Sequence, residues 1–313
     1  MRLVITGALG HIGSFLIREL SLPGFQSIDL IDNLATQRYA SLFNLPDRCQ
    51  YCFYERDILS DQIEEVISKA DCLIHLAAIT DAESSIHQEE VVKKVNEGGL
   101  AKLATWCARH KVPIIFPSTT SVYGTQEEVV DENCPLPDLK PQSPYAASKL
   151  HGERLLQDFG KEEGLEFVVL RLGTIFGFSV GMRFHTAVNK FIWQALKGES
   201  LTIWKTALHQ KRPYCGLGDC KNAIETIIKG NQFDGEVYNI VSENTSVQEV
   251  IDLIQKNIQK VDIKMVDSPI MNQLSYEVSN EKSKRIGMKY SDQLNKSIQD
   301  TIERLRCSSK AIY

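Results

Sequence analysis

Two residues near the middle of the chain could carry out proton transfer. Tyr145 and Lys149 stand four positions apart, so on a helix they share one face. A free tyrosine titrates near pH ~10 and is a poor base at neutral pH, but a nearby ammonium group favours the phenolate. The pair could then accept the proton of an alcohol that loses hydride. Most Tyr/Lys pairs at this spacing are only helix surface pairs, so the interpretation needs support from other residues.

Hydroxyl side chains follow a predicted strand over residues 113–116. The run reads Ser118-Thr119-Thr120-Ser121-Val122-Tyr123-Gly124. Ligands of parallel sheets bind beyond the carboxyl ends of the strands, so this run would lie where a substrate binds. Turn and capping roles are the alternative for any single hydroxyl.

A third set of residues has the spacing of a phosphate-binding turn. Gly7, Gly10 and Gly13 form GxxGxxG between a predicted strand and a predicted helix, with His11 and Ile12 inside the turn. Glycines permit the tight turn and let backbone N–H groups approach a pyrophosphate. The strand before and the helix after favour a dinucleotide site.

Acidic residues follow the next two strands. Asp32 comes about 20 residues after the glycines, where a carboxylate can accept both ribose hydroxyls and would repel a 2′-phosphate. This favours NAD over NADP, although Arg38 nearby keeps NADP open. The alternative for Asp32 is a turn residue before Asn33. Asp57, followed by Ile58, could hold the adenine edge or could instead cap a helix.

The elements that must position these residues alternate between strand and helix. Strands are expected over residues 2–6, 27–31, 71–78, 113–116 and 166–172, with later helices over 61–70, 96–110 and 145–159. Strands that are apolar on both faces predict a parallel sheet covered on both sides. Right-handed crossovers then give an α/β fold with a doubly wound parallel sheet of the Rossmann type.

The alternation loosens after about Gly177. Residues 178–183 and 206–218 are typical of loops, and Ser246 with Glu249 forms a capping box before an amphipathic helix. We therefore expect a dinucleotide-binding domain over residues 1–177 and a smaller mixed α/β substrate domain over residues 178–313. Crossings of the chain between the two lobes stay open.

The composition is that of an ordinary globular protein. The 313 residues are 43% hydrophobic and 24% charged, with a formal net charge of −5, which favours neither nucleic acid nor an anionic membrane as a partner. No run approaches the ~18 apolar residues of a membrane helix, so we expect a cytoplasmic protein. The 8 cysteines are scattered, and Cys49 and Cys52 would point to opposite faces of a strand, so we expect reduced thiols and no metal.

Taken together, the motifs resemble those of a known family. They are Gly7-x-x-Gly10-x-x-Gly13, Asp32-Asn33-Leu34, Asp57-Ile58, Leu76-Ala77-Ala78, Asn96, Ser118 to Gly124, Tyr145-x-x-x-Lys149, Leu170-Arg171 and Gly177. The chain is similar over nearly its whole length to the extended short-chain dehydrogenase/reductases, and more narrowly to the NAD-dependent nucleotide-sugar epimerases and dehydratases. Arg212-Pro213-Tyr214 with Asp219, and Tyr238-Asn239-Ile240, look like that family's substrate lobe.

The resemblance implies a role for each matching residue. Tyr145 would be the acid/base, and Lys149 would bind the nicotinamide ribose and lower the pKa of the tyrosine. Thr119 would hydrogen-bond the reacting sugar oxygen, and Arg212 would meet the nucleotide diphosphate, although it could be a surface arginine. The cofactor would be lined by Asn96 and by Leu76, Ala77 and Ala78.

Departures from the family pattern bear on the substrate. Thr120 and Ser121 stand where the 4,6-dehydratases have Asp-Glu, so no carboxyl group is present to protonate a leaving hydroxyl. Thr80 and Thr174 replace the lysine and asparagine of galactose 4-epimerases, so substrate contacts differ and UDP-galactose is in doubt. The loop that holds Arg183 and Asn189, with His185 between them, is a further candidate for sugar or diphosphate contacts.

The resemblance implies oxidation at C4 of a nucleotide-linked hexose. Hydride passes from C4 to NAD+ while Tyr145 takes the hydroxyl proton; return of hydride to the other face gives a 4-epimerase. Alternatives are a 4-dehydrogenase or ketoreductase, and, from another class, a non-catalytic dinucleotide sensor. The family commonly forms a homodimer through two helices per chain, here those expected over residues 96–110 and 145–159.

Overall fold

Runs of apolar and often β-branched residues form the strands of a main sheet. The computed structural model describes residues 1–124, 129–267 and 275–309. Within them this sheet has seven strands, all parallel, in the order β10-β6-β5-β4-β1-β2-β3. The strands are Arg2–Thr6 (β1), Ser27–Asp32 (β2), Gln50–Glu55 (β3), Cys72–His75 (β4), Ile114–Thr119 (β5), Phe167–Leu172 (β6) and Val237–Ile240 (β10).

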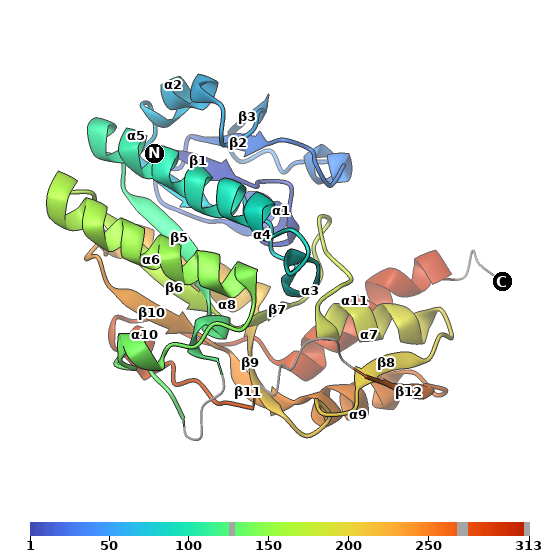
Figure 1. The fold of residues 1–313 in the computed structure, drawn as a ribbon. Coiled ribbons are helices and arrows are strands. Elements are labelled where there is room, and N and C mark those ends of the chain that lie inside the picture. The colour runs from blue at the N-terminus through green and yellow to red at the C-terminus, as the bar shows by residue number, and fades with distance from the viewer. Residues whose placement is uncertain (125–128, 268–274, 310–313) are drawn as a thin grey trace.

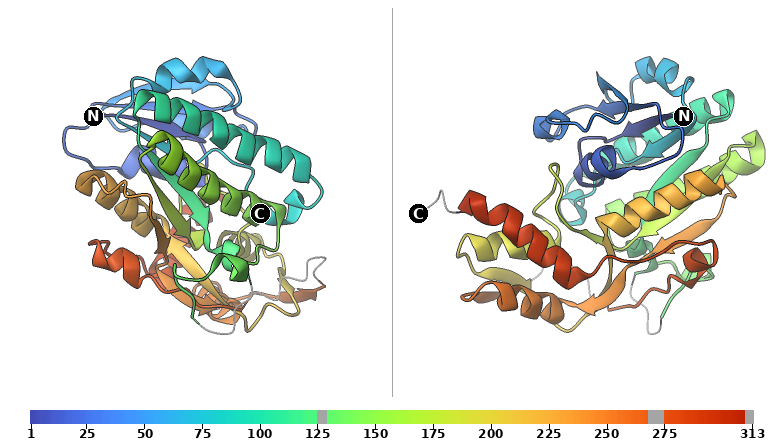
Figure 2. Two further views of the ribbon diagram at one scale, coloured as in Figure 1. Left: turned by 60° about the vertical axis from the view of Figure 1, so that its left-hand side comes forward. Right: turned by 180° about the vertical axis from the view of Figure 1, so that it is seen from behind.

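Helices cover both faces of the main sheet, which confirms the doubly wound fold. One face carries Glu64–Ile67 (α2), Gly99–His110 (α5) and Pro144–Glu163 (α6), and α5 and α6 lie side by side (Figure 1). The other face carries His11–Glu19 (α1) and Leu217–Gly230 (α8), seen from behind in Figure 2. Before α5 the chain forms Ala82–Ser85 (α3), Glu89–Val92 (α4) and a π-helical stretch, Lys93–Gly98.

The remaining elements make a smaller lobe with its own apolar core. In the described residues it holds a three-stranded sheet, β11-β9-β7, and a two-stranded sheet, β12-β8. Their bounds are Thr174–Phe176 (β7), Leu201–Trp204 (β8), Lys211–Gly216 (β9), Glu243–Ser246 (β11) and Ile263–Val266 (β12). Its helices are Ala187–Leu196 (α7), Val247–Asn257 (α9) and Leu294–Ser309 (α11), which pack together away from the main sheet (Figure 1).

Local signals fix the ends of the helices that matter most for the site. α6 begins where Ser143 accepts a hydrogen bond from the N–H of Ala146 and Pro144 takes the first position. It ends at Gly164, whose left-handed backbone caps the helix. The expected capping box at the start of α9 is present, with Ser246 and Glu249 each bonding the other's backbone N–H.

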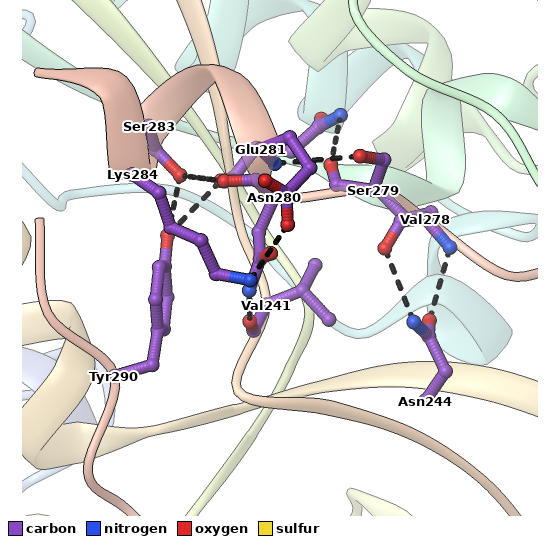
Figure 3. Close-up of polar contacts among 10 residues, drawn as sticks. Val241, Asn244, Val278, Ser279, Asn280, Glu281, Ser283, Lys284 and Tyr290 are labelled. Carbon is purple, nitrogen blue, oxygen red and sulfur yellow. Dashed lines mark hydrogen bonds and ion pairs between the residues drawn. The ribbon is translucent and has the colours of Figure 1, made fainter.

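The chain crosses between the lobes after residue 177. β10 pairs with β6 in the main sheet, so assigning Tyr238–Ile240 to the substrate lobe was wrong. The short helix α10 (Glu281–Arg285) then packs beside β10, and Figure 3 shows the contacts that hold this segment. Asn280 Nδ2 donates to Val241 O (2.7 Å), and Asn244 pairs with the backbone of Val278. As a boundary between lobes, residue 177 stays a prediction.

Two expected elements are shorter than predicted. The strand over 71–78 begins at Cys72 and ends at His75, and the backbone of Leu76 and Ala77 beyond it lies against Gly7. The helix over 61–70 reduces to a 3₁₀ turn, Asp61–Ile63, and α2. Within the described ranges, no helix is long and apolar enough to cross a membrane.

Candidate active site

The glycine turn between β1 and α1 leaves no room for side chains. Gly7 has φ +65°, and a Cβ there would lie 2.5 Å from the backbone nitrogen of Ala77. At Gly13 a Cβ would lie 2.4 Å from the carbonyl oxygen of Ala8. Gly10 precedes α1 as its N-terminal cap residue, so the unpaired N–H groups of the first helical turn lie next to glycines that carry no side chain. This cradle fits a dinucleotide pyrophosphate.

Asp32 and Asp57 lie at the carboxyl ends of neighbouring strands. Asp32 accepts hydrogen bonds from the N–H of Leu9 (3.1 Å) and of Leu34 (2.9 Å), which places it against the glycine turn. Asn33 Nδ2 donates to Asp57 Oδ2 (2.8 Å), and Asp57 also caps the N–H of Leu59. The arrangement fits the ribose and adenine end of a dinucleotide.

Two other residues near this end have different surroundings. Ile58 is buried, and its side chain packs against Gly99 of α5. Arg38 faces Asp32: burial lowers the pKa of the Arg38 guanidinium, and the carboxylate of Asp32 opposes that shift. Arg38 therefore lies at the ribose end, as the sequence position suggests.

Tyr145 and Thr119 meet at the carboxyl end of β5. The Thr119 side chain lies beside the phenol of Tyr145, which stands in the first turn of α6. Burial raises the pKa of Tyr145, while the positive charge of Arg183 and the polar contact with Thr119 oppose that rise. The structure thus brings together two of the three predicted catalytic residues, and the positive charge that acts on the phenol comes from Arg183.

Lys149 points into the interior beneath the site. Its Nζ donates to the carbonyl oxygen of Pro117 (2.8 Å) and lies 4.5 Å from the ring centre of Phe116. Loss of water lowers the pKa of Lys149 to about 7. Behind it, His75 pairs with the hydroxyl of Thr6 (2.8 Å), and burial lowers the pKa of His75 to about 3, with a smaller contribution from Lys149.

Asn96 ties the loop after β4 to α6. Its side chain accepts a bond from the N–H of Ile79 (2.8 Å) and donates to Ile79 O (3.0 Å) and Ser148 Oγ (2.9 Å). Asn96 therefore fixes the backbone that follows Leu76, Ala77 and Ala78, and holds it against the helix that carries Tyr145. Direct contact between these four residues and the cofactor stays a prediction.

The loop from Gly177 to Arg183 docks on the glycine turn. His11 Nε2 bonds Gly177 O (2.9 Å), Ser179 Oγ donates to His11 O (2.8 Å), and Ser14 Oγ accepts the N–H of Gly181 (2.9 Å). A Cβ at Gly181 would lie 2.2 Å from the carbonyl oxygen of Leu9. The sequence gives no sign of this docking, because the partners lie far apart along the chain.

Arg183 follows the docked loop and enters the site. It donates to the Thr80 hydroxyl, and Asn189 Nδ2 holds its carbonyl oxygen (3.0 Å). Burial lowers the pKa of Arg183, and its Nε has no hydrogen-bond partner within the described part of the chain. Arg183 is thus placed to contact a substrate, and Asn189 would act through Arg183. Nearby His185 is held neutral, since burial lowers its pKa to about 4.

Two further predicted residues, Arg212 on β9 and Thr174 on β7, lie in the three-stranded sheet of the smaller lobe, and their contact with a substrate stays a prediction. These strands are neighbours, with Thr174 opposite Tyr214. Arg212 donates to Gln210 (3.3 Å), and its buried Nε is unpaired among the residues described. Tyr276, which sequence reasoning missed, lies beside the Thr120 and Ser121 side chains, whose polar contact opposes the rise in its pKa that burial causes. Buried Glu153 and its partner Arg171 were likewise given no role; they lie below Lys149.

The sequence matches a known family and a curated relative over most of its length. The model of the NAD-dependent epimerase/dehydratase family matches residues 3–241. A Bacillus subtilis (strain 168) protein described as an uncharacterized UDP-glucose epimerase is 30% identical over 263 residues, which are 82% of this chain and 81% of that protein.

Two solved structures are similar over almost their full length. The UDP-glucuronic acid 4-epimerase of Bacillus cereus, in complex with UDP-glucuronic acid and NAD, has a TM-score of 0.89 at 26% identity and covers 97% of this chain and 100% of its own. The UDP-glucose 4-epimerase of Thermus thermophilus, in complex with NAD, has a TM-score of 0.82 at 25% identity, with 98% and 99% covered.

Proposed function

The chain belongs to the NAD-dependent epimerase/dehydratase family, and from this membership we propose that it is a 4-epimerase of a nucleotide-diphosphate hexose. It is an NAD-dependent enzyme of the extended short-chain dehydrogenase/reductase type. The juxtaposition of the Thr119 and Tyr145 side chains at the end of β5 carries the proposal, because two polar groups side by side at this strand end suit one reacting hydroxyl group.

The chain's own residues would handle the proton and hold the substrate. Tyr145 takes the proton of the C4 hydroxyl and Thr119 hydrogen-bonds the same oxygen, so the developing carbonyl is held in place. Arg212 binds the diphosphate, for which a planar guanidinium is well suited. NAD, when bound, supplies the acceptor and later the donor of the hydride at C4. Tyr145 then returns its proton, so the net reaction changes stereochemistry without consuming an oxidant.

Two observations support epimerisation over loss of water. Thr120 and Ser121 follow Thr119 and carry no carboxyl group; their side chains lie beside Tyr276 instead. Both of the solved structures described above are 4-epimerases by name, one acting on a UDP-hexuronate and one on a UDP-hexose. A UDP-linked sugar is therefore the first substrate to test.

A panel of nucleotide sugars tests the proposal. Purified protein is incubated with UDP-, GDP-, CDP- and dTDP-hexoses and with UDP-glucuronic acid, while nicotinamide absorbance and sugar stereochemistry are followed together. We expect the C4 epimer of at least one substrate with no net NADH. Stoichiometric NADH, or a requirement for an external oxidant, would instead indicate a 4-dehydrogenase or ketoreductase. Binding without turnover across the panel would indicate a dinucleotide sensor.

We also propose that two copies pair through the outer faces of α5 and α6. These helices lie side by side on one face of the main sheet (Figure 2). Leu155 and Phe159 on α6 are only half-buried, and they line a shallow groove with Arg154 and Asp158. Analytical ultracentrifugation is expected to give a dimer at micromolar concentration, and a Leu155→Glu variant is expected to shift it to monomer. A wild-type protein that sediments as monomer throughout would contradict this pairing.

A further inference from the structure

Lys149 carries its amine into an environment that disfavours charge. The side chain is 5% exposed, and its Nζ lies between the Pro117 carbonyl (2.8 Å) and the face of the Phe116 ring. A carbonyl dipole and an aromatic ring stabilise an ammonium group less than water does. A buried ammonium group of this kind needs a negative charge nearby, or it gives up its proton.

Glu153 supplies such a charge one helical turn further along α6. Its side chain is buried, at 2% exposure. Arg171 on β6 holds both carboxylate oxygens, with Nη2 at 2.7 Å from Oε2 and Nε at 3.1 Å from Oε1, which is the geometry of an ionised carboxylate. The Ser118 hydroxyl donates to Oε1 (2.5 Å). Glu153 and Lys149 therefore both contact residues 117–118, directly before Thr119.

We propose that Glu153 is a positioning residue that keeps Lys149 protonated within the active site. Resting on the proposed function, this assigns an electrostatic role to Glu153: its carboxylate preserves the positive charge of Lys149, whose Nζ contacts Pro117 two residues before Thr119. Arg171 has the opposite effect, because it neutralises part of the charge of Glu153. The ion pair between Glu153 and Arg171 thus controls the protonation of Lys149, and it also joins α6 to β6.

The other groups around Lys149 do not replace Glu153. On β4, burial lowers the pKa of His75 to about 3, so its ring is neutral and supplies no charge to Lys149. On α6 itself, Tyr145 faces Arg183 and Thr119. On β5 the neighbours are Phe116 and Pro117, which carry no charge. Among these groups the carboxylate of Glu153 is the one that raises the pKa of Lys149, against the larger effect of burial.

Direct titration of Lys149 tests the proposal without a substrate. Protein labelled with ¹³C at the lysine ε-carbon is titrated by NMR, and the signal of Lys149 is assigned by its loss in Lys149→Met. In Glu153→Gln we expect the midpoint to fall by about one pH unit or more. In Arg171→Gln it should rise, because the carboxylate is no longer shared. A purely structural ion pair would not shift the two midpoints in opposite directions.

The double variant Glu153→Gln/Arg171→Gln decides the outcome if a single variant does not fold. It removes both charges of the ion pair, so no buried charge of the pair is left without a partner. Circular dichroism checks that this variant is folded. A midpoint below that of the wild type supports the proposal, and a midpoint equal to that of the wild type overturns it. The alkaline limb of kcat/KM should move in the same direction as the midpoint. Inactivity of the wild type on the whole sugar panel would contradict the proposed function and leave the NMR result standing.

Discussion

Replacement of Tyr145 by phenylalanine is expected to lower kcat by about 10²- to 10⁴-fold, the usual contribution of a positioned acid/base. The change deletes only the hydroxyl that lies beside Thr119 and keeps the ring in the first turn of α6. Fold and cofactor content should therefore stay at wild-type levels. Turnover of the substrate found in the sugar panel, together with NAD released on denaturation, measures both quantities.

Tyr238→Phe is the matched control for this variant. Tyr238 also loses one hydroxyl, but that hydroxyl donates to Asp234 (2.6 Å) at the edge of the main sheet. We expect its kcat to remain within about twofold of the wild type, because the buried ring is kept and the lost hydroxyl contact lies outside the candidate site. Unchanged turnover in Tyr145→Phe would remove Tyr145 from the proton transfer.

Replacement of Gly7 by alanine is expected to abolish most NAD binding and to destabilise the fold. The residue has φ +65°, which is costly for a residue with a Cβ, and that Cβ would lie 2.5 Å from the backbone nitrogen of Ala77. Since Ala77 N belongs to main chain, the turn itself must move. We expect a loss of about 2–5 kcal/mol in the free energy of unfolding and at least a ~10-fold weaker affinity for NAD. Thermal unfolding and calorimetric titration with NAD measure the two effects.

Gly164→Ala separates backbone strain from the close approach. Gly164 has nearly the same φ, +67°, but no atom lies within 4 Å of its would-be Cβ. It caps the far end of α6, so its replacement should cost only about 1 kcal/mol and leave NAD affinity unchanged. Equal effects of the two variants on NAD affinity would show that the approach of Gly7 to Ala77 does not shape the cofactor site.

Local patterns were sufficient to predict several elements in the first half of the fold. β1, α1 and β2 follow from an apolar strand, a glycine turn and a helical period, and α6 follows from Ser143, Pro144 and Gly164. β10 was not predicted as part of the main sheet. Nothing in the sequence of its four residues indicates which strand they pair with. The pairing with β6 depends on how α8 returns the chain to the main sheet.

The candidate site was predictable where a residue type at a fixed spacing is tied to chemistry. This holds for Tyr145 with Lys149 and for the glycines. Residues that act through long-range contacts were missed: Tyr276 lies far along the chain from Thr120, and Glu153 is separated from Arg171 by a turn and a strand. A glutamate inside a helix gives no hint that it is buried. Such roles follow from tertiary packing, which spacing alone does not encode.

The return of the chain to the main sheet matters for anyone who wants to exchange substrate preference between relatives. A hybrid joined once, at residue 177, would take α8 and β10 from the donor and leave β6 beside a foreign neighbour. An unmatched edge strand of this kind invites aggregation. A transplant that respects the architecture therefore needs several junctions. The donor supplies β7 to β9 and the segment from β11 onward, and the recipient keeps residues 217–240. The residues of α10 that contact β10 must then match the recipient.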